Sequence, residues 1–267
     1  MLTIFCQWNQ KESSRVGDPP LSSLGHQQAR DLGKFLDSFL TENAGITSSD
    51  QITWLSSPFL RCLQTSEDAL GEFHKVDNSE SIKVLPEYSV FEWDGKGGKW
   101  HESLPPLEER IHYFPRLDTS YQSMFVPEIP EPRAAFLDRC DRGIRSLNQR
   151  FPFRPKTAIV IVTHAAACIG LARAAANRTL QDITPAAPCS VFGLVRSENT
   201  NVWTIDPFDA PKGLNGYTDH LSKMGTVTVP WNHFADKKVH EGYTGPPLSR
   251  FAPSSVKAEF ANGTEHK

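Results

Sequence analysis

Three features are scarce in this chain, and each scarcity excludes a class of protein. The five cysteines among 267 residues are far apart, odd in number and never spaced as C-x-x-C, which argues against a disulfide framework and a thiolate metal site. No stretch approaches the roughly 18 consecutive apolar residues of a membrane-spanning helix. Basic residues form no block and the net charge is -3, so nothing favours direct binding to nucleic acid.

The first residues also lack the pattern of a signal peptide, because they are too soon polar. We therefore expect a cytoplasmic or nuclear protein with no membrane association. Its length is sufficient for a full core, and is long for one domain but short for two. The sequence predicts a single α/β domain over residues 1–244, followed by a disordered tail over 245–267, where apolar residues are few. The oligomeric state is left open.

What the chain does contain is a strand–helix junction around which the rest can be arranged. Residues 158–162 are apolar and mostly β-branched, which predicts a strand buried on both faces, and an alanine-rich helix is expected from Ala165 to Ala176. His164 then stands at the carboxyl end of a central strand, where open α/β sheets bind ligands and a helix N-terminus favours an anion. Taken alone, this stretch equally allows a buried histidine satisfied by hydrogen bonds.

Shorter segments on both sides fit the same α/β architecture. Further strands are predicted at 2–5, 52–56, 82–85, 190–196 and 201–205, the last two as a hairpin. Helices are predicted at about 25–40, at 59–70 and from Pro132 onward. The charged face of the helix after Pro132 is most simply a solvated one. The sequence therefore predicts three layers, a mostly parallel sheet flanked by helices, with a long insertion at about 93–130 whose aromatics favour an ordered lid.

Three side chains with complementary chemistry follow three of the predicted strands. Arg61 lies just inside the helix after the second strand, Glu87 follows the third, and His164 ends the central one. A guanidinium binds phosphate in bidentate fashion, an imidazole can relay protons to a phosphoryl group, and a carboxyl can protonate a leaving oxygen. If the three converge on one sheet edge, they indicate phosphoryl chemistry without a metal.

Four segments in order support this interpretation. They are GDPPLS with GHQQA from Gly17, SSPFLRCLQT from Ser56, Glu87 followed by FEW, and VTHA from Val162. In order and spacing the chain resembles the histidine phosphatase superfamily, also called phosphoglycerate-mutase-like, over roughly residues 15–205. The details look closest to the subgroup of the protein-tyrosine-phosphatase domains of suppressors of T-cell receptor signalling. The phosphatase-like domain of a fungal RNA polymerase III transcription factor subunit is also similar.

The resemblance implies phosphomonoester hydrolysis through a phosphohistidine, with no metal or organic cofactor. Arg61 would be the second phosphate-binding arginine and His164 the second histidine. Glu87 would be the general acid, with Glu92 as a possible substitute and Asp94 as a competitor for the role. The ligand would be a phosphorylated small molecule or a phosphoprotein.

The chain departs from this family in one respect: it contains no Arg-His-Gly, the triplet that ends the first strand and carries the nucleophile. Alignment on Trp8 would place the triplet over Met1, Leu2 and Thr3. Without the nucleophile covalent catalysis should be lost, and phosphate binding should be weakened. The chain is then an inactive member that binds a phosphorylated ligand or a protein. Alternatively it is an active phosphatase whose first ten or so residues reflect another start or exon, or a structural subunit of a nuclear transcription complex.

Overall fold

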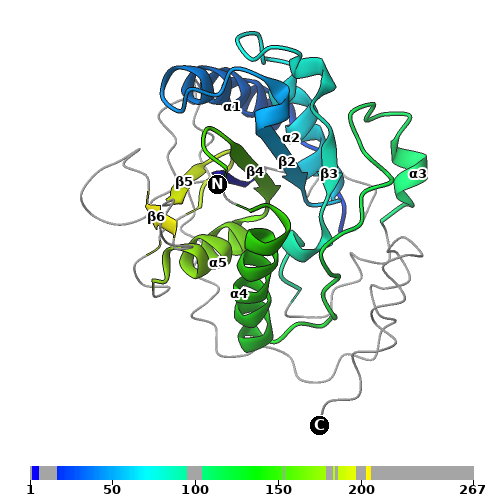
Figure 1. The fold of residues 1–267 in the computed structure, drawn as a ribbon. Coiled ribbons are helices and arrows are strands. Elements are labelled where there is room, and N and C mark those ends of the chain that lie inside the picture. The colour runs from blue at the N-terminus through cyan, green and yellow to red at the C-terminus, as the bar shows by residue number, and fades with distance from the viewer. Residues whose placement is uncertain are drawn as a thin grey trace.

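The computed structural model describes residues 2–5, 17–94, 104–152, 154–178, 183, 186–196 and 203–205. Within them the strands form one sheet in the order β3-β2-β4-β1-β5-β6 (Figure 1). The strands are β1 (Leu2–Phe5), β2 (Ile52–Ser56), β3 (Val84–Pro86), β4 (Ala158–Thr163), β5 (Val191–Arg196) and β6 (Trp203–Ile205). The first four strands run parallel, and β5 and β6 form an antiparallel extension at one edge.

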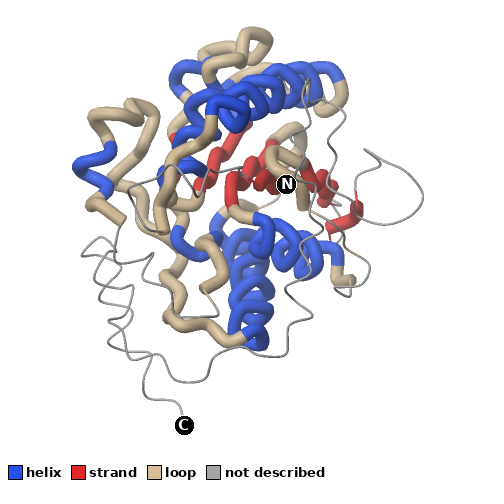
Figure 2. The backbone as a smooth tube through the Cα atoms, turned by 180° about the vertical axis from the view of Figure 1, so that it is seen from behind, coloured by secondary structure: helices blue, strands red, loops and turns tan. Residues whose placement is uncertain are grey.

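Helices cover both faces of this sheet (Figures 1 and 2). They are α1 (Ser23–Glu42), α2 (Leu60–Leu70), α3 (Leu107–Arg110), α4 (Arg133–Arg150) and α5 (Ala165–Ala176). Strand β4 lies between two apolar clusters, since Val160 and Val162 pack with residues of α1 and α2 while Ile161 packs with residues of α4 and α5. The predicted three-layer α/β fold and the predicted double burial of the central strand are therefore confirmed.

Small residues let the helices of each layer approach closely. A Cβ at Gly33 of α1 would lie 2.2 Å from the carbonyl oxygen of Ala69 in α2. On the other face, a Cβ at Gly170 of α5 would lie 2.6 Å from Sγ of Cys140 in α4. These contacts set the helix separations, and through them the position of the α2 and α5 N-termini relative to the sheet.

The insertion contributes to the core as well as to the surface. Its described part, from residue 104 onward, buries Leu104, Leu107, Phe114 and Leu117 in the α1–α2 layer. It also extends the sheet at β3, because the backbone N–H of Val84 donates to Arg116 O at 2.8 Å. This part is packed against the domain, whereas residues 95–103 of the predicted lid, like the predicted tail 245–267, lie outside the described residues.

Candidate functional site

The predicted strand–helix junction places His164 at the carboxyl edge of the sheet. The residue follows β4 directly and caps α5, whose Cys168 N–H donates to His164 O at 2.7 Å. Its side chain is completely buried. The imidazole lies between two polar groups, with Nε2 2.8 Å from Oγ of Ser57 and Nδ1 2.9 Å from Nη2 of Arg61.

Arg61 reaches this edge because β2 and β4 end side by side. The Ser57 N–H donates to Val162 O at 2.8 Å, which brings the turn after β2, and with it the start of α2, next to the end of β4. The Arg61 guanidinium lies 4.5 Å from the centre of the Phe59 ring, and the same ring packs edge-on against His164 with centroids 4.9 Å apart. The predicted convergence of Arg61 and His164 is therefore present in the structure.

The acidic member of this group is Glu92. Its Oε2 lies 3.2 Å from His164 Nδ1 and 3.4 Å from Arg61 Nη2. Burial alone would raise the pKa of Glu92, but the imidazolium form of His164, which is present only at acidic pH, and the permanent Arg61 cation outweigh burial and lower it, so the carboxyl is ionised at neutral pH. Glu92 is also the most exposed of the three, with 16% of its side chain accessible against 3% for Arg61 and 0% for His164.

The imidazole is neutral at neutral pH. Burial lowers the pKa of His164 to about 4, and the Arg61 cation acts in the same direction, although Glu92 opposes both. A neutral imidazole has one N–H, so Nδ1 cannot both accept from Arg61 and donate to Glu92. The shorter Arg61 distance favours an accepting Nδ1, with the Nε2–H donating to Ser57. His164 is then held as an acceptor toward Arg61.

Glu87, the predicted acid, does not join this hydrogen-bonded group. Its carboxylate is completely buried and, among the described residues, forms no hydrogen bond or ion pair with Arg61 or His164. It accepts hydrogen bonds from the Ser89 N–H at 2.9 Å, the Tyr121 hydroxyl at 2.7 Å, the Met124 N–H at 3.0 Å and the Ser123 hydroxyl. Glu87 therefore anchors the insertion, and the alternative acid, Glu92, lies beside the histidine.

Local hydrogen bonds explain why the later glutamate reaches the site. After β3 the chain makes a short 3-10 turn, Tyr88–Val90, and the Thr163 hydroxyl donates to Val90 O at 2.5 Å. This bond ties the turn to the residue just before His164. Asp94, the other predicted competitor, is buried, and its backbone oxygen accepts from the Glu131 N–H at 3.0 Å.

Arg139 of α4 supports the Glu92 segment, although the sequence predicted a solvated face for the charged residues of this helix. It is buried in a bidentate pair with Glu131, at 2.7 and 2.8 Å, and its Nη1 donates to the carbonyl oxygens of Ser89 and Phe91. A signal was present in the sequence, because Arg139 lies three residues after the core residue Phe136 and so shares its helix face.

Asp18 is a second polar residue that the sequence reasoning missed. It is completely buried, and its Oδ1 accepts from the Leu60 N–H at 2.6 Å at the start of α2. Its Oδ2 pairs with Nη2 of Arg110 at 2.5 Å, and Arg110 Nη1 also donates to Pro58 O at 2.6 Å. Asp18 thus fixes the helix start that carries Arg61, which gives the Gly17-Asp18 motif a structural role.

Strand β1 lies in the sheet beside β4, the strand that ends at His164. Leu2 and Thr3 pair with Val160 and Ile161, and Phe5 pairs with Thr163, the residue before His164. Residues 6–16 lie outside the described residues, so the place of the missing triplet stays a prediction.

The described residues contain no group of three or more His, Cys, Asp or Glu side chains arranged to hold a metal ion. None of the helices in these parts of the chain is long and apolar enough to cross a membrane.

A doubly covered parallel sheet with an arginine and a histidine at its carboxyl edge defines an α/β protein of the phosphoglycerate-mutase-like class. The family model of the histidine phosphatase superfamily, branch 1, matches residues 6–205. The chain therefore belongs to the histidine phosphatase superfamily, and the prediction of that family is confirmed. No curated protein sequence matches the chain significantly.

Solved structures show the same fold. The ecdysone phosphate phosphatase of Bombyx mori aligns with a TM-score of 0.54 at 18% identity, covering 80% of this chain and 81% of its own. YhfR of Bacillus stearothermophilus aligns with a TM-score of 0.51 at 18% identity, covering 82% and 98%. A mycobacterial glucosyl-3-phosphoglycerate phosphatase aligns with a TM-score of 0.51 at 15% identity, covering 79% of this chain and 96% of its own. These identities support a common fold only.

Proposed function

We propose that this protein binds the phosphoryl group of a phosphorylated small molecule or phosphoprotein, and does not hydrolyse it through a phosphohistidine. One observation carries the proposal. The sequence contains no Arg-His-Gly, the triplet whose histidine would accept the phosphoryl group. The retained Arg61 and His164 do not replace that histidine, so the covalent step lacks its nucleophile.

The retained side chains support anion binding. Arg61 is a permanent cation whose position is fixed by Phe59 and His164, and the N-terminus of α5 adds a favourable partial charge at the same edge. In the absence of a ligand, the Glu92 carboxylate supplies the negative charge beside Arg61. Glu92 is more exposed than Arg61 and His164, so an incoming phosphate would replace its carboxylate at the guanidinium.

The test uses the purified full chain with p-nitrophenyl phosphate, and with inorganic phosphate as a binding probe in isothermal titration calorimetry. We expect no turnover and saturable phosphate binding that Arg61→Met abolishes. Turnover that His164→Ala removes would overturn the non-hydrolysing assignment. A folded protein with no phosphate binding, or with binding unaffected by Arg61→Met, would overturn the binding function.

A motif that ends the first strand would follow β1 directly in the sequence, and a gain-of-function variant tests this proposed position. Cys6→Arg, Gln7→His and Trp8→Gly together restore the family triplet, and we expect aryl phosphatase activity and an acid-labile phosphohistidine in this triple variant. The matched control carries Gln7→Asn with the same two flanking changes and should remain inactive. A folded, phosphate-binding triple variant that forms no phosphohistidine would show that the motif does not belong at residues 6–8.

A further inference from the structure

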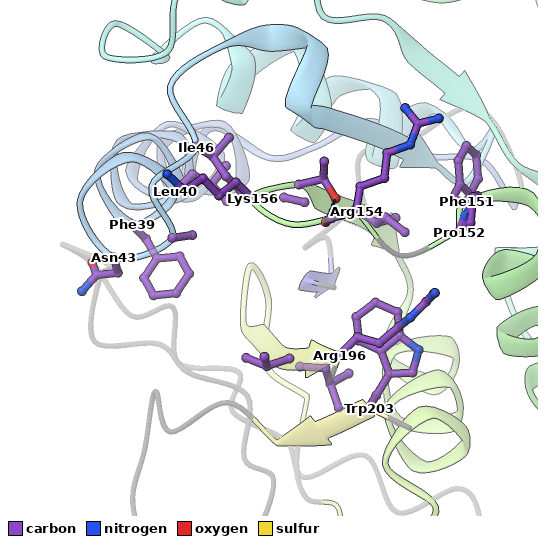
Figure 3. Close-up of a pocket in the computed structure, with 16 residues that line it drawn as sticks. Phe39, Leu40, Asn43, Ile46, Phe151, Pro152, Arg154, Lys156, Arg196 and Trp203 are labelled. Carbon is purple, nitrogen blue, oxygen red and sulfur yellow. Dashed lines mark hydrogen bonds between the residues drawn. The ribbon is translucent and has the colours of Figure 1, made fainter. Parts of the chain in front are cut away.

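A second pocket lies at the opposite edge of the sheet from His164. It has a volume of about 390 Å³ and opens where β4 begins and β5 ends (Figure 3). Its walls come from the end of α1, the segment that leads into β4, and the strands β5 and β6. Five residue steps along the chain, from the lining residue Ile159 to His164, separate the pocket from the phosphate site by roughly 16 Å at about 3.3 Å per residue, so a ligand here would not touch the Arg61 group.

The lining combines aromatic walls with charge of one sign. Phe39 stands on one side, Phe151 on the other and Trp203 below (Figure 3). Arg154, Lys156 and Arg196 also line the pocket, and no described lining residue carries a carboxylate. Val195, another lining residue, leaves 49% of its surface exposed, and among the described residues only Ile111 and Tyr113 are other large apolar residues of comparable exposure. The pocket therefore offers apolar surface and positive charge together.

Part of this surface is held in place before any ligand arrives. Asn148 of α4 accepts two hydrogen bonds at its Oδ1, from Arg196 Nη1 at 2.8 Å and from Trp203 Nε1 at 3.1 Å. The Arg196 guanidinium also lies 5.6 Å from the centre of the Trp203 ring. Fixing a cation and an aromatic face in this way reduces the conformational entropy that a ligand would otherwise have to remove.

We propose that this pocket binds a small amphipathic anion, with an aromatic or branched apolar body against the three aromatic walls and one acidic group facing the basic side chains. The volume lies in the range of small-molecule sites, roughly 300–1,000 Å³. The all-positive charge of the lining selects an anion over a neutral or cationic ligand, and the apolar walls select a body that inorganic anions lack. The proposal is independent of the phosphate site.

The probe for the test is 8-anilinonaphthalene-1-sulfonate, an aromatic anion whose fluorescence rises in apolar surroundings. We expect saturable binding of one equivalent to the full chain. The double variant Arg154→Glu and Lys156→Glu should weaken this binding at least tenfold, because both residues are exposed and their reversal repels the sulfonate. The charge-matched control, Arg145→Glu with Arg178→Glu, also changes two exposed arginines and should bind as the natural protein does.

Two further measurements make the outcome decisive. The uncharged analogue N-phenyl-1-naphthylamine should bind more weakly and should not lose affinity in the Arg154→Glu and Lys156→Glu variant. In NMR titrations the sulfonate should shift the backbone amides of residues 194–196 and leave those around His164 unchanged. Equal loss in the two double variants, no binding by the folded protein, or shifts confined to other parts of the chain would overturn the proposal.

Discussion

Replacing Glu92 by glutamine should tighten phosphate binding. The substitution keeps the shape of the side chain and removes the negative charge 3.4 Å from Arg61 Nη2 and 3.2 Å from His164 Nδ1. A phosphate oxygen bound to that guanidinium would come within about 5 Å of the carboxylate, where two unit charges repel by roughly 3 kcal/mol at an effective dielectric constant of about 20. Glu92 is partly exposed, so water screens some of this repulsion.

After this screening we expect a gain of about 1.4 kcal/mol, a tenfold decrease in the dissociation constant for inorganic phosphate. Isothermal titration calorimetry at low ionic strength measures the change directly. Glu87→Gln is the matched control, because it neutralises another buried carboxylate that contacts neither Arg61 nor His164 among the described residues. That variant should lose stability without gaining affinity.

The reasoning would be refuted if the folded Glu92→Gln protein bound phosphate with unchanged or lower affinity. Such a result would mean that the carboxylate does not compete with the ligand at Arg61. A tenfold gain in the Glu87→Gln control would refute it equally, because the effect would then be one of net charge and not of position.

Three further predictions concern stability and are measured by urea unfolding. Gly33→Ala should destabilise the protein by at least about 1–3 kcal/mol, because the new Cβ meets a carbonyl oxygen of α2. Gly143→Ala, whose new Cβ has its nearest contact at 3.6 Å, should stabilise the protein by up to about 1 kcal/mol. Equal changes in the free energy of unfolding of the two variants would contradict the close α1–α2 packing. Arg139→Met should lower the free energy of unfolding by about 3–5 kcal/mol, because it leaves the buried Glu131 carboxylate unpaired. The control Arg145→Met changes an exposed arginine of the same helix and should lower it little, and equal losses in the two variants would contradict the buried ion pair. Burial lowers the pKa of His164 to about 4 from 6.5, so the unfolded chain takes up a proton at this residue before the folded protein does. The free energy of unfolding should therefore be constant above pH 6.5 with respect to this group and fall by up to about 3 kcal/mol towards pH 4. His164→Gln should reduce this pH dependence, and an unchanged pH dependence would contradict the shift.

The sequence predicted those parts of the site that follow directly from strand ends. Arg61 lies just inside the helix that follows β2, His164 follows β4 directly, and these two parallel strands are neighbours, so the strand–helix pattern already indicated that the two side chains could meet. Glu87 also follows a strand, but the 3-10 turn after β3 and its bond to Thr163 bring Glu92 to the histidine instead. Such a turn depends on contacts distant in sequence, which periodicity does not contain.

Tertiary contacts also account for the residues that the sequence did not identify. Arg139 was grouped with solvated charges because its partner, Glu131, lies across a turn and outside the helix pattern. The second pocket has no motif, because its walls come from segments around residues 39–46, 151–159 and 194–203 that meet only in the folded chain.

The steady-state rate of p-nitrophenyl phosphate hydrolysis by the purified full chain, measured beside its His164→Ala variant, decides whether the protein has the phosphate site without the nucleophile, as we propose. We expect the same background rate for both proteins. Turnover by the natural chain that His164→Ala abolishes would show that the chain is a phosphatase.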